Sequence, residues 1–307
     1  MFEGGTMIDF KSIKLEDKPL YEKYLFDGIE RGCEYSFANL YMWGERYWAI
    51  VEEQMVVLSY YDKWTSYLYP LGNGDKKPVL DAIIQDAKER GIALCMMGMC
   101  GEKRQGLDAS YPGQFTYRGS QSFDDYVYDI NDLADLKGRK YHRKKNHYNR
   151  FLKNYPDYRV EPLGEHNMEA VKTMISEWYE QKSVENPDSD FEMEKVAITK
   201  GLDAYQELGM EGLLLFVDEK IVAFTMGSFM GAHTMDVHYE KARSDIDGAY
   251  TAINCEFAKY IRAKYPDILF LNREEDMGLE GLRKAKESYY PHHMVAKCQA
   301  ILKESTL

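Results

Sequence analysis

The sequence predicts an α/β (α+β) protein with two tandem domains, each built on a mixed, mainly antiparallel sheet flanked by helices. Three observations predict this class. The chain has 307 residues, 45% of them hydrophobic, which is enough for two cores of ordinary size. Its hydrophobic periodicity predicts the same order of elements twice: strand, helix, helix, three strands, helix, strand, helix, strand. A basic stretch at residues 138–153 separates the two passes.

The first pass begins at Met7. Alternating apolar residues predict a strand at 7–13, and apolar residues at helical spacing predict helices at 15–26 and 33–44. Three segments rich in Val, Tyr and Trp then predict an antiparallel meander. A helix that ends at Gly91, a buried strand, a short helix and a last strand complete the pass. The meander is expected at 47–53, 54–61 and 65–71, and the later elements at 75–91, 92–99, 101–111 and 124–130.

The second pass follows the basic stretch. It opens with a strand and two helices, continues with three strands, and ends with a helix, a strand, a short helix and a strand. The expected ranges are 158–163, 164–182, 190–209, 211–218, 220–229, 232–241, 248–266, 267–274, 279–290 and 293–302. The repeated order predicts an N-terminal domain at 7–135, a basic connecting helix at 136–155 and a C-terminal domain at 156–307.

Composition excludes several classes of protein. Five cysteines stand at irregular spacings without a CxxC pair, so we expect neither a disulfide framework nor a bound metal, and we expect a cytoplasmic protein. No apolar run approaches the roughly 20 residues of a membrane span, so no transmembrane segment is expected. The formal net charge is -12. Such a charge excludes a protein that coats nucleic acid with its whole surface.

The order of elements resembles the GNAT acyltransferase fold. That family binds acyl-CoA where its fourth and fifth strands splay apart, and it holds the pyrophosphate at the N-terminus of the next helix, where backbone N–H groups are free. In the second domain the matching loop is 243–248, in which Asp245 and Asp247 stand near Arg243 and would repel a pyrophosphate. In the first domain the matching loop, 70–78, has two glycines and two lysines, which fit a phosphate but also fit a plain turn.

Three carboxylates crowd the end of the strand expected at 267–274. Glu274, Glu275 and Asp276 are consecutive, and their crowding should raise the pKa of at least one of them toward the range of a general base. A site is commonly built where a strand ends. The alternative interpretation is a charged turn before a helix. Its acids would favour the N-terminus of the helix, and the bases would favour the C-terminus.

Polar and basic side chains surround these acids and are the expected substrate contacts. Asn272 and Arg273 precede them, while Arg283 and Lys286 stand three apart on one face of the next helix. The arginines are also suited to steady charge that develops during a reaction. Tyr289 is the candidate proton donor.

A second polar group lies on the strand expected at 232–241. Asp236, His238 and Glu240 are spaced by two, so the alternation of a strand places them on one face, pointing into one cleft. His238 titrates in the range that acid–base chemistry uses, and Asp236 and Glu240 are further candidates for substrate binding. A strand that exposes its polar side to solvent is the equally weighted alternative.

The basic stretch predicts an amphipathic helix. Seven Lys or Arg and no acid occur between residues 138 and 153. At helical spacing, Tyr141, Tyr148, Phe151 and Leu152 form a packing stripe, and three arginines fall within about 40° of one another on the far side. Because no acid is interleaved, a phosphate partner is favoured over a helix paired with acids elsewhere. The candidate phosphate-binding residues are Arg139, Arg143, Asn146, Arg150 and Lys153.

Three segments together make the chain similar to the bacterial family of the C-terminal domain of phosphatidylglycerol lysyltransferase. They are residues 272–291, 140–151 and 34–43. The similarity covers essentially the whole chain as two tandem GNAT-like domains, an architecture shared with Fem-type peptidoglycan aminoacyltransferases. Characterised relatives move an aminoacyl group from aminoacyl-tRNA to a lipid headgroup. The multi-span membrane portion of the lipid-modifying enzymes has no counterpart here, so the resemblance implies a soluble acceptor or a membrane met from the cytoplasmic side.

The resemblance implies acyl or aminoacyl transfer, with aminoacyl-tRNA as the favoured donor. The acceptor would be an amine or hydroxyl on a lipid headgroup, a peptide or a small molecule. Transfer needs a base for the nucleophile, donors for the oxyanion and a proton for the leaving oxygen. Two alternatives stay open: an acyl-CoA-dependent N-acyltransferase, and a non-catalytic protein that binds tRNA or anionic lipid. No cofactor is expected other than aminoacyl-tRNA or acyl-CoA as the donor.

Overall fold

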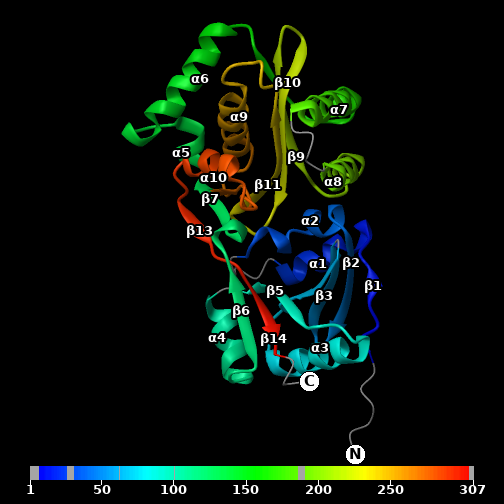
Figure 1. The fold of residues 1–307 in the computed structure, drawn as a ribbon. Helices are drawn as coiled ribbons and strands as arrows, with labels where there is room; N and C mark the ends of the chain where they lie inside the picture. The colour runs from blue at the N-terminus through cyan, green and yellow to red at the C-terminus, as the bar shows by residue number, and fades with distance from the viewer. Residues whose placement is uncertain (1–6, 26–30, 62, 100, 186–190, 304–307) are drawn as a thin grey trace, which may run out of the picture. The chain divides into compact units, whose positions relative to one another are not determined.

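The computed structural model describes residues 7–25, 31–61, 63–99, 101–185 and 191–303, which form two compact units (Figure 1). Unit 1 is built from the chain up to Asp125, from Glu275–Gly278 and from Val295 onward. Unit 2 is built from Tyr126–Glu274 and Leu279–Met294. Both units are therefore discontinuous in sequence, whereas the repeated order of elements predicted consecutive domains.

Unit 1 has a seven-stranded sheet in the order β1-β2-β3-β4-β5-β14-β6. Its neighbouring strands are antiparallel except for β4 and β5, which run parallel because α3 crosses over between them. The strands are β1 (Lys11–Ser12), β2 (Glu45–Val51), β3 (Gln54–Tyr61), β4 (Trp64–Leu68), β5 (Cys95–Met99), β6 (Phe115–Gly119) and β14 (Cys298–Leu302). The helices are α1 (Lys18–Leu25), α2 (Phe37–Met42), α3 (Lys76–Arg90) and α4 (Gly101–Ser110).

Unit 2 repeats this plan with the strand order β13-β7-β12-β11-β10-β9-β8. Strands β9 to β11 form an antiparallel meander, and β8 pairs antiparallel with β9. Strands β11 and β12 run parallel because α9 crosses over between them. The strands are β7 (Asp125–Asp129), β8 (Arg159–Pro162), β9 (Glu211–Val217), β10 (Lys220–Phe229), β11 (Thr234–Ala242), β12 (Phe270–Asn272) and β13 (His293–Val295). The helices are α5 (Ile130–Asp135), α6 (His142–Asn154), α7 (Met168–Glu185), α8 (Glu192–Asp203), α9 (Ala249–Lys264) and α10 (Glu280–Glu287).

The tight turn of the meander is built in the same way in both units. Glu52 and Glu53 join β2 to β3, and Asp218 and Glu219 join β9 to β10. All four residues have a positive φ, between 48° and 60°. Two consecutive left-handed residues give the turn whose twist matches an antiparallel hairpin. The repeat that the sequence predicted therefore extends to the geometry of the turns.

The last strands of the two sheets are exchanged. β7 follows β6 in the sequence but pairs with β12 in unit 2, and β14 near the C-terminus pairs with β5 and β6 in unit 1. The sequence predicted residues 124–130 to close the first domain and 293–302 to be one strand. The latter run divides into β13 and β14, because the N–H of Lys297 between them donates to the Asp124 carboxylate and not to a neighbouring strand.

Helix α9 lies on one face of the unit 2 sheet, and α7 lies on the other (Figure 1). The basic helix α6 packs against α9 through the stripe that its periodicity predicted. Tyr141 and Phe151 are fully buried there, and Tyr148 and Leu152 pack against the same core. Arg143, Lys145, Arg150 and Lys153 of α6 are exposed on its other side.

Candidate active site

Strands β11 and β12 part within unit 2, as the fourth and fifth strands of a GNAT fold do. They pair only from Thr234 to Asp236 and from Phe270 to Asn272. Beyond this point β11 continues to Ala242 without β12 beside it. The side chains of the expected site emerge where the two strands separate.

A bulge in β11 changes which face its side chains occupy. Met226 and Gly227 of β10 pair with Tyr239 and Val237, so His238 is an extra residue between them. Val237 packs in the core with α9, so Asp236 and His238 on either side of it point to the opposite face. Past the bulge the alternation is reversed.

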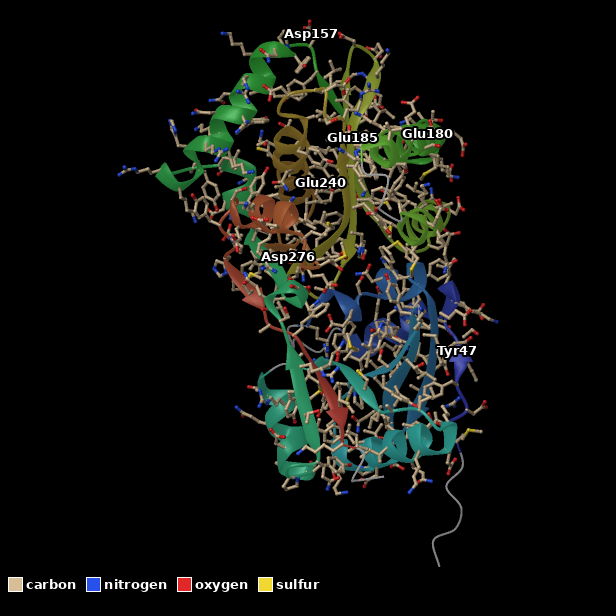
Figure 2. All side chains as sticks on the ribbon, in the orientation of Figure 1. Tyr47, Asp157, Glu180, Glu185, Glu240 and Asp276 are labelled. Atoms are coloured by element: carbon tan, nitrogen blue, oxygen red, sulfur yellow. The ribbon has the colours of Figure 1, made fainter. Side chains whose placement is uncertain are left out.

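Glu240 consequently lies on the α9 face. Labelled in Figure 2, it accepts a hydrogen bond from Asn254 of α9 over 3.0 Å. Lys241, its neighbour, instead donates to Glu194 of α8 over 2.7 Å. The prediction that Asp236, His238 and Glu240 share one face is therefore wrong for Glu240, because a bulge breaks the alternation on which it was based.

His238 is held between a hydroxyl and a carboxylate. Its Nε2 lies 2.8 Å from Ser228 Oγ, and its Nδ1 lies 3.1 Å from Glu274 Oε1 and 3.6 Å from Asp236 Oδ2. Since a carboxylate only accepts, the hydrogen between Nδ1 and Glu274 belongs to the imidazole. A neutral His238 then offers Nε2 as the acceptor for the Ser228 hydroxyl. The carboxylate thereby fixes the tautomer of the imidazole, and the imidazole N–H in turn holds the carboxylate in place.

Glu274 is the most accessible acid of this group. Its side chain is 22% exposed, whereas those of His238 and Asp236 are 1% and 0% exposed. Its backbone has a φ of 58°, a conformation that costs a residue with a side chain about 1–2 kcal/mol. The Asn272 side chain supports this conformation by accepting from the Glu274 N–H over 2.7 Å. The carboxylate is thus aimed at His238 by a strained turn at the strand end.

On the α9 face, Arg273 and Glu240 form a buried ion pair across the parted strands. Nη2 of Arg273 lies 2.9 Å from Glu240 Oε1, and the two side chains are 13% and 12% exposed. The rings of Tyr128 and Tyr289 have their centroids 5.5 and 5.0 Å from the guanidinium carbon. Within the described part of the chain, Nη1 of Arg273 is buried and has no hydrogen-bond acceptor.

Tyr289 and Lys286 reach this face from α10 and the residues after it. Burial is the main cause that raises the pKa of Tyr289 to about 12, so its hydroxyl keeps its proton at neutral pH. Lys286 is buried and donates to the main-chain oxygen of Arg273 over 2.5 Å, and its own carbonyl accepts from Tyr128. Lys286 thus holds the backbone at the end of β12. Arg283, one turn earlier in α10, is half-buried.

The three consecutive acids do not share one environment. Glu275 and Asp276 belong to unit 1, whereas Glu274 belongs to unit 2. Glu275 accepts from Lys297 over 2.8 Å, and Asp276 is fully buried and accepts from the Gly278 N–H over 2.8 Å. The pKa of Glu275 is raised, but burial and not crowding is the first cause. The chain turns sharply here, with positive φ at Glu274 and Met277, and so separates the carboxylates.

Lys297 is the centre of a buried ionic cluster in unit 1 that sequence reasoning missed. Its Nζ lies 2.6 Å from Asp125 Oδ1, 3.3 Å from Glu34 Oε2 and 3.4 Å from Cys33 Sγ. With Glu275, these groups hold the pKa of Lys297 well above its usual value, against the effect of burial. The sequence feature that could have revealed this cluster is a lysine inside the apolar run at 293–302.

The cations of the basic segment fall into two groups, those that pair with a carboxylate of the described chain and those that do not. Arg150 is paired with Asp247, whose Oδ1 lies 2.9 Å from Arg150 Nη2. Arg139, Arg143 and Lys153 are exposed, and no carboxylate of the described residues pairs with them. Arg139 stands in a short 3-10 turn before α6 and not in the helix itself. Asn146, also exposed, lies 3.4 Å from His142 Nδ1.

The loop that would hold a pyrophosphate in unit 2 is occupied by groups of the chain itself. A Cβ added at Gly248, the residue before α9, would lie 2.9 Å from the main-chain oxygen of His147 and from Phe151 Cβ. Helix α6 therefore packs directly against the start of α9. Asp247 pairs with Arg150, and Asp245 pairs with Arg243. This arrangement gives acyl-CoA no free helix terminus at the expected place.

Two groups of side chains in the described residues could hold a metal ion. The ligand atoms of Asp236, His238 and Glu274 lie within 4.8 Å of one another, and so do those of Cys33, Glu34 and Asp125. In the first group both imidazole nitrogens already have hydrogen-bonding partners. In the second, the ammonium of Lys297 provides the positive charge. Protein contacts thus already use some of the ligand atoms in both groups, although Asp236 Oδ1 and both Glu34 oxygens are buried without a hydrogen-bond donor among the described residues.

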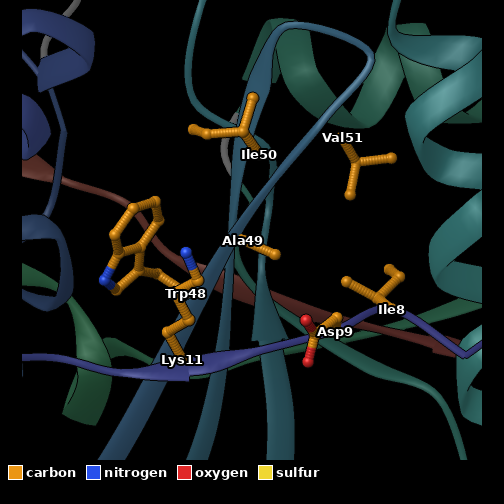
Figure 3. Close-up of a pocket in the computed structure, with 7 residues that line it drawn as sticks. All are labelled: Ile8, Asp9, Lys11, Trp48, Ala49, Ile50 and Val51. Atoms are coloured by element: carbon orange, nitrogen blue, oxygen red, sulfur yellow. The ribbon is translucent and has the colours of Figure 1, made fainter.

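A pocket of about 390 Å³ lies at the edge of the unit 1 sheet, between residues 8–11 and residues 48–51 of β2 (Figure 3). Apart from Asp9 and Lys11, its lining is apolar. None of the candidate site residues lines it.

The sequence of the chain matches a family model over residues 28–300. The description of that family is phosphatidylglycerol lysyltransferase, C-terminal. The chain belongs to this family. The resemblance inferred from the sequence is confirmed, and no curated protein matches the chain.

Three solved structures are similar to this chain over most of its length. A conserved protein of unknown function from Bacteroides thetaiotaomicron VPI-5482 is 37% identical, with a TM-score of 0.92, over 97% of this chain and 100% of that one. L-PGS from Bacillus licheniformis is 14% identical, with a TM-score of 0.67, over 94% and 92%. FemX is 12% identical, with a TM-score of 0.62, over 97% and 98%. The last two likenesses show the fold alone, a tandem pair of GNAT-like domains.

Among the described residues, no helix is long and apolar enough to cross a membrane. The family and the fold put the chain in the GNAT-like superfamily of acyl and aminoacyl transferases.

Proposed function

We propose that the chain is an aminoacyltransferase that takes an aminoacyl group from aminoacyl-tRNA and transfers it to an amine or hydroxyl. The observation that carries the proposal is the pairing of His238 with Glu274 at the point where β11 and β12 part. Aminoacyl transfer from an ester needs a base for the incoming nucleophile, and this pair has the required connectivity. The family supports the aminoacyl class of donor.

Glu274 is the group that takes the proton of the acceptor. It is the more exposed member of the pair, and the N–H of His238 stabilises its charge. Ser228 and Asp236 hold the imidazole in place. Arg273 supplies positive charge beside the parted strands for the oxyanion, and Tyr289 keeps the proton that a leaving oxygen needs.

Acyl-CoA is the weaker candidate donor. In unit 2 the start of α9 is covered by α6, and the acids of the loop are paired with arginines of the chain. A non-catalytic protein that binds tRNA or anionic lipid is the alternative of another class, because the exposed cations of α6 would serve it equally well.

Incubation with a pool of charged tRNAs, with and without candidate acceptors, tests the proposal. The wild-type chain should accelerate deacylation, and Glu274→Gln should lower the rate by about 10²–10⁴-fold. Glu280→Gln is the matched control, because its carboxylate is 80% exposed and pairs only with Lys284 among the described residues. It should leave the rate unchanged.

Each of the three functions gives its own result. Acetyl-CoA that binds tightly and is consumed would replace the proposed donor. Binding of tRNA or anionic lipid without turnover of any acyl donor would leave the non-catalytic function. Equal rates for wild type and Glu274→Gln would remove Glu274 from the mechanism.

A further inference from the structure

Lys144 differs from the other cations of the basic helix. Its Nζ lies 3.9 Å from the centroid of the Tyr289 ring, and its side chain is half-buried. Arg143 and Lys145, the residues on either side, are exposed. No carboxylate within the described chain forms an ion pair with Lys144. The sequence did not single it out, although at helical spacing it falls within the packing stripe, between Tyr148 and Phe151.

A second positive charge lies behind Lys144. The guanidinium carbon of Arg273 is 5.0 Å from the centroid of the same Tyr289 ring. The charge of Glu240 acts on both, but one of its oxygens accepts from Arg273 and the other from Asn254. Burial, followed by the charge of Arg273, lowers the pKa of Lys144 to about 8. Two like charges therefore meet at one ring, with Nη1 of Arg273 still lacking an acceptor.

An anion at Lys144 would relieve this repulsion, and the neighbouring surface indicates a polyanion. Arg139 and Arg143 are exposed, and neither pairs with a carboxylate of the described chain. A row of cations without acids fits successive phosphates better than it fits a single small anion. An ammonium that donates to a phosphate oxygen forms a strong, charge-assisted hydrogen bond.

We propose that Lys144 binds a phosphodiester of an RNA strand, with the buried charge of Arg273 behind it and the exposed Arg139 and Arg143 along the neighbouring phosphates. This inference rests on the proposed aminoacyl-tRNA donor and names its phosphate contact. Lys144 is the accessible group, and Arg273 acts through its charge. Arg150, which Asp247 neutralises, contributes little.

Binding of uncharged tRNA to the full chain, measured by titration at constant salt, tests this assignment. Lys144→Gln should weaken binding by about tenfold, since a half-buried charge contact is lost. Lys144→Arg keeps the charge and should stay within about threefold of wild type. Lys145→Gln is the matched control: it removes the same charge one residue away at an exposed position, and it should change binding by about twofold at most.

Equal losses in Lys144→Gln and Lys145→Gln would overturn the assignment in favour of general surface attraction. An undiminished affinity in Lys144→Gln would overturn it as well. If tRNA fails to bind but glycerophosphoglycerol binds and depends on Lys144, the site takes a lipid headgroup and the RNA assignment is wrong. The tRNA carries no aminoacyl group in this measurement, so its outcome is independent of the deacylation assay that tests the transfer reaction.

Discussion

The gap where the two parallel strands separate is closed in different ways in the two units. In unit 1 the parting of β4 and β5 is filled by Tyr35, whose hydroxyl lies 3.3 Å from the main-chain oxygens of Tyr69 and Gly98. Lys103 donates to the Gly98 oxygen as well, over 2.9 Å. In unit 2 the parting of β11 and β12 is spanned by the ion pair of Arg273 and Glu240.

The difference indicates where chemistry can occur. In unit 1 a neutral hydroxyl and an ammonium satisfy the carbonyls released by the parting strands, and the fully buried ring of Tyr35 fills the space. In unit 2 the gap holds opposite charges, an unused N–H and, beside it, the pair of His238 and Glu274. We infer that unit 1 has become a scaffold and that unit 2 carries the reaction.

The largest expected effect comes from breaking the ion pair in unit 2. Glu240→Ala leaves the Arg273 charge buried without its partner, so the free energy of unfolding should fall by about 3–5 kcal/mol. The exposed pair of Arg150 and Asp247 is the control, since both side chains are 50% exposed and Asp247→Asn should cost at most about 1 kcal/mol. Urea unfolding measures both. Similar losses for the two variants would mean that the buried pair has no special role.

The packing of Tyr35 between the parting strands of unit 1 should be sensitive to added volume. Gly98 has a φ of 71°, and a Cβ there would lie 2.3 Å from the Tyr35 hydroxyl. Gly113 has nearly the same φ, 70°, but nothing lies within 4 Å of its added Cβ. Gly98→Ala should therefore destabilise the chain by about 1–3 kcal/mol more than Gly113→Ala, because overpacking is added to the same backbone strain. Thermal unfolding of the two variants would show no difference if Tyr35 were free to move aside.

The charged site of unit 2 should respond to pH. Lys144 has a pKa of about 8 and binds a phosphate only when protonated, so tRNA affinity should fall by up to about tenfold as the pH rises from 7 to 9. The groups that act on Lys144 are Arg273, Glu240, Arg143 and the ring of Tyr289. His147 also interacts with Lys144, but burial is the first cause that lowers the pKa of His147, so its imidazole is neutral over this range. The arginines stay charged over this range, and Tyr289, with a pKa of about 12, stays neutral. In Lys144→Gln this decrease should vanish, and a decrease of the same size there would assign the titration to another group.

The sequence predicted most of the local structure, because local structure follows from periodicity. Apolar spacing at 141–152 identified the buried stripe of α6, and strand-like apolar runs located both meanders. The short strand β6 was not expected, because its alternation of Phe115 and Tyr117 with Thr116 and Arg118 extends over only five residues.

Less of the candidate site could be predicted, because its geometry depends on pairing between distant segments. The spacing of Asp236 and His238 correctly placed them together, but the bulge that reverses Glu240 has no signature in the sequence. Ser228 stands on another strand, and only the register of β10 and β11 brings it to His238. The ionic cluster around Lys297 could not be predicted, because it depends on the exchange of β7 and β14 between the two sheets.

The exchange of β7 and β14 also has a consequence for biosynthesis. Most of unit 1 precedes unit 2 in the sequence, yet its sheet lacks the strand between β5 and β6 until residues 298–302 have left the ribosome. The strands of unit 1 are thus translated before unit 2 but completed after it, and their open edges must wait for the residues of unit 2 to be made. Consecutive domains could close one after the other during translation, whereas in this chain unit 1 closes only after unit 2 has been translated.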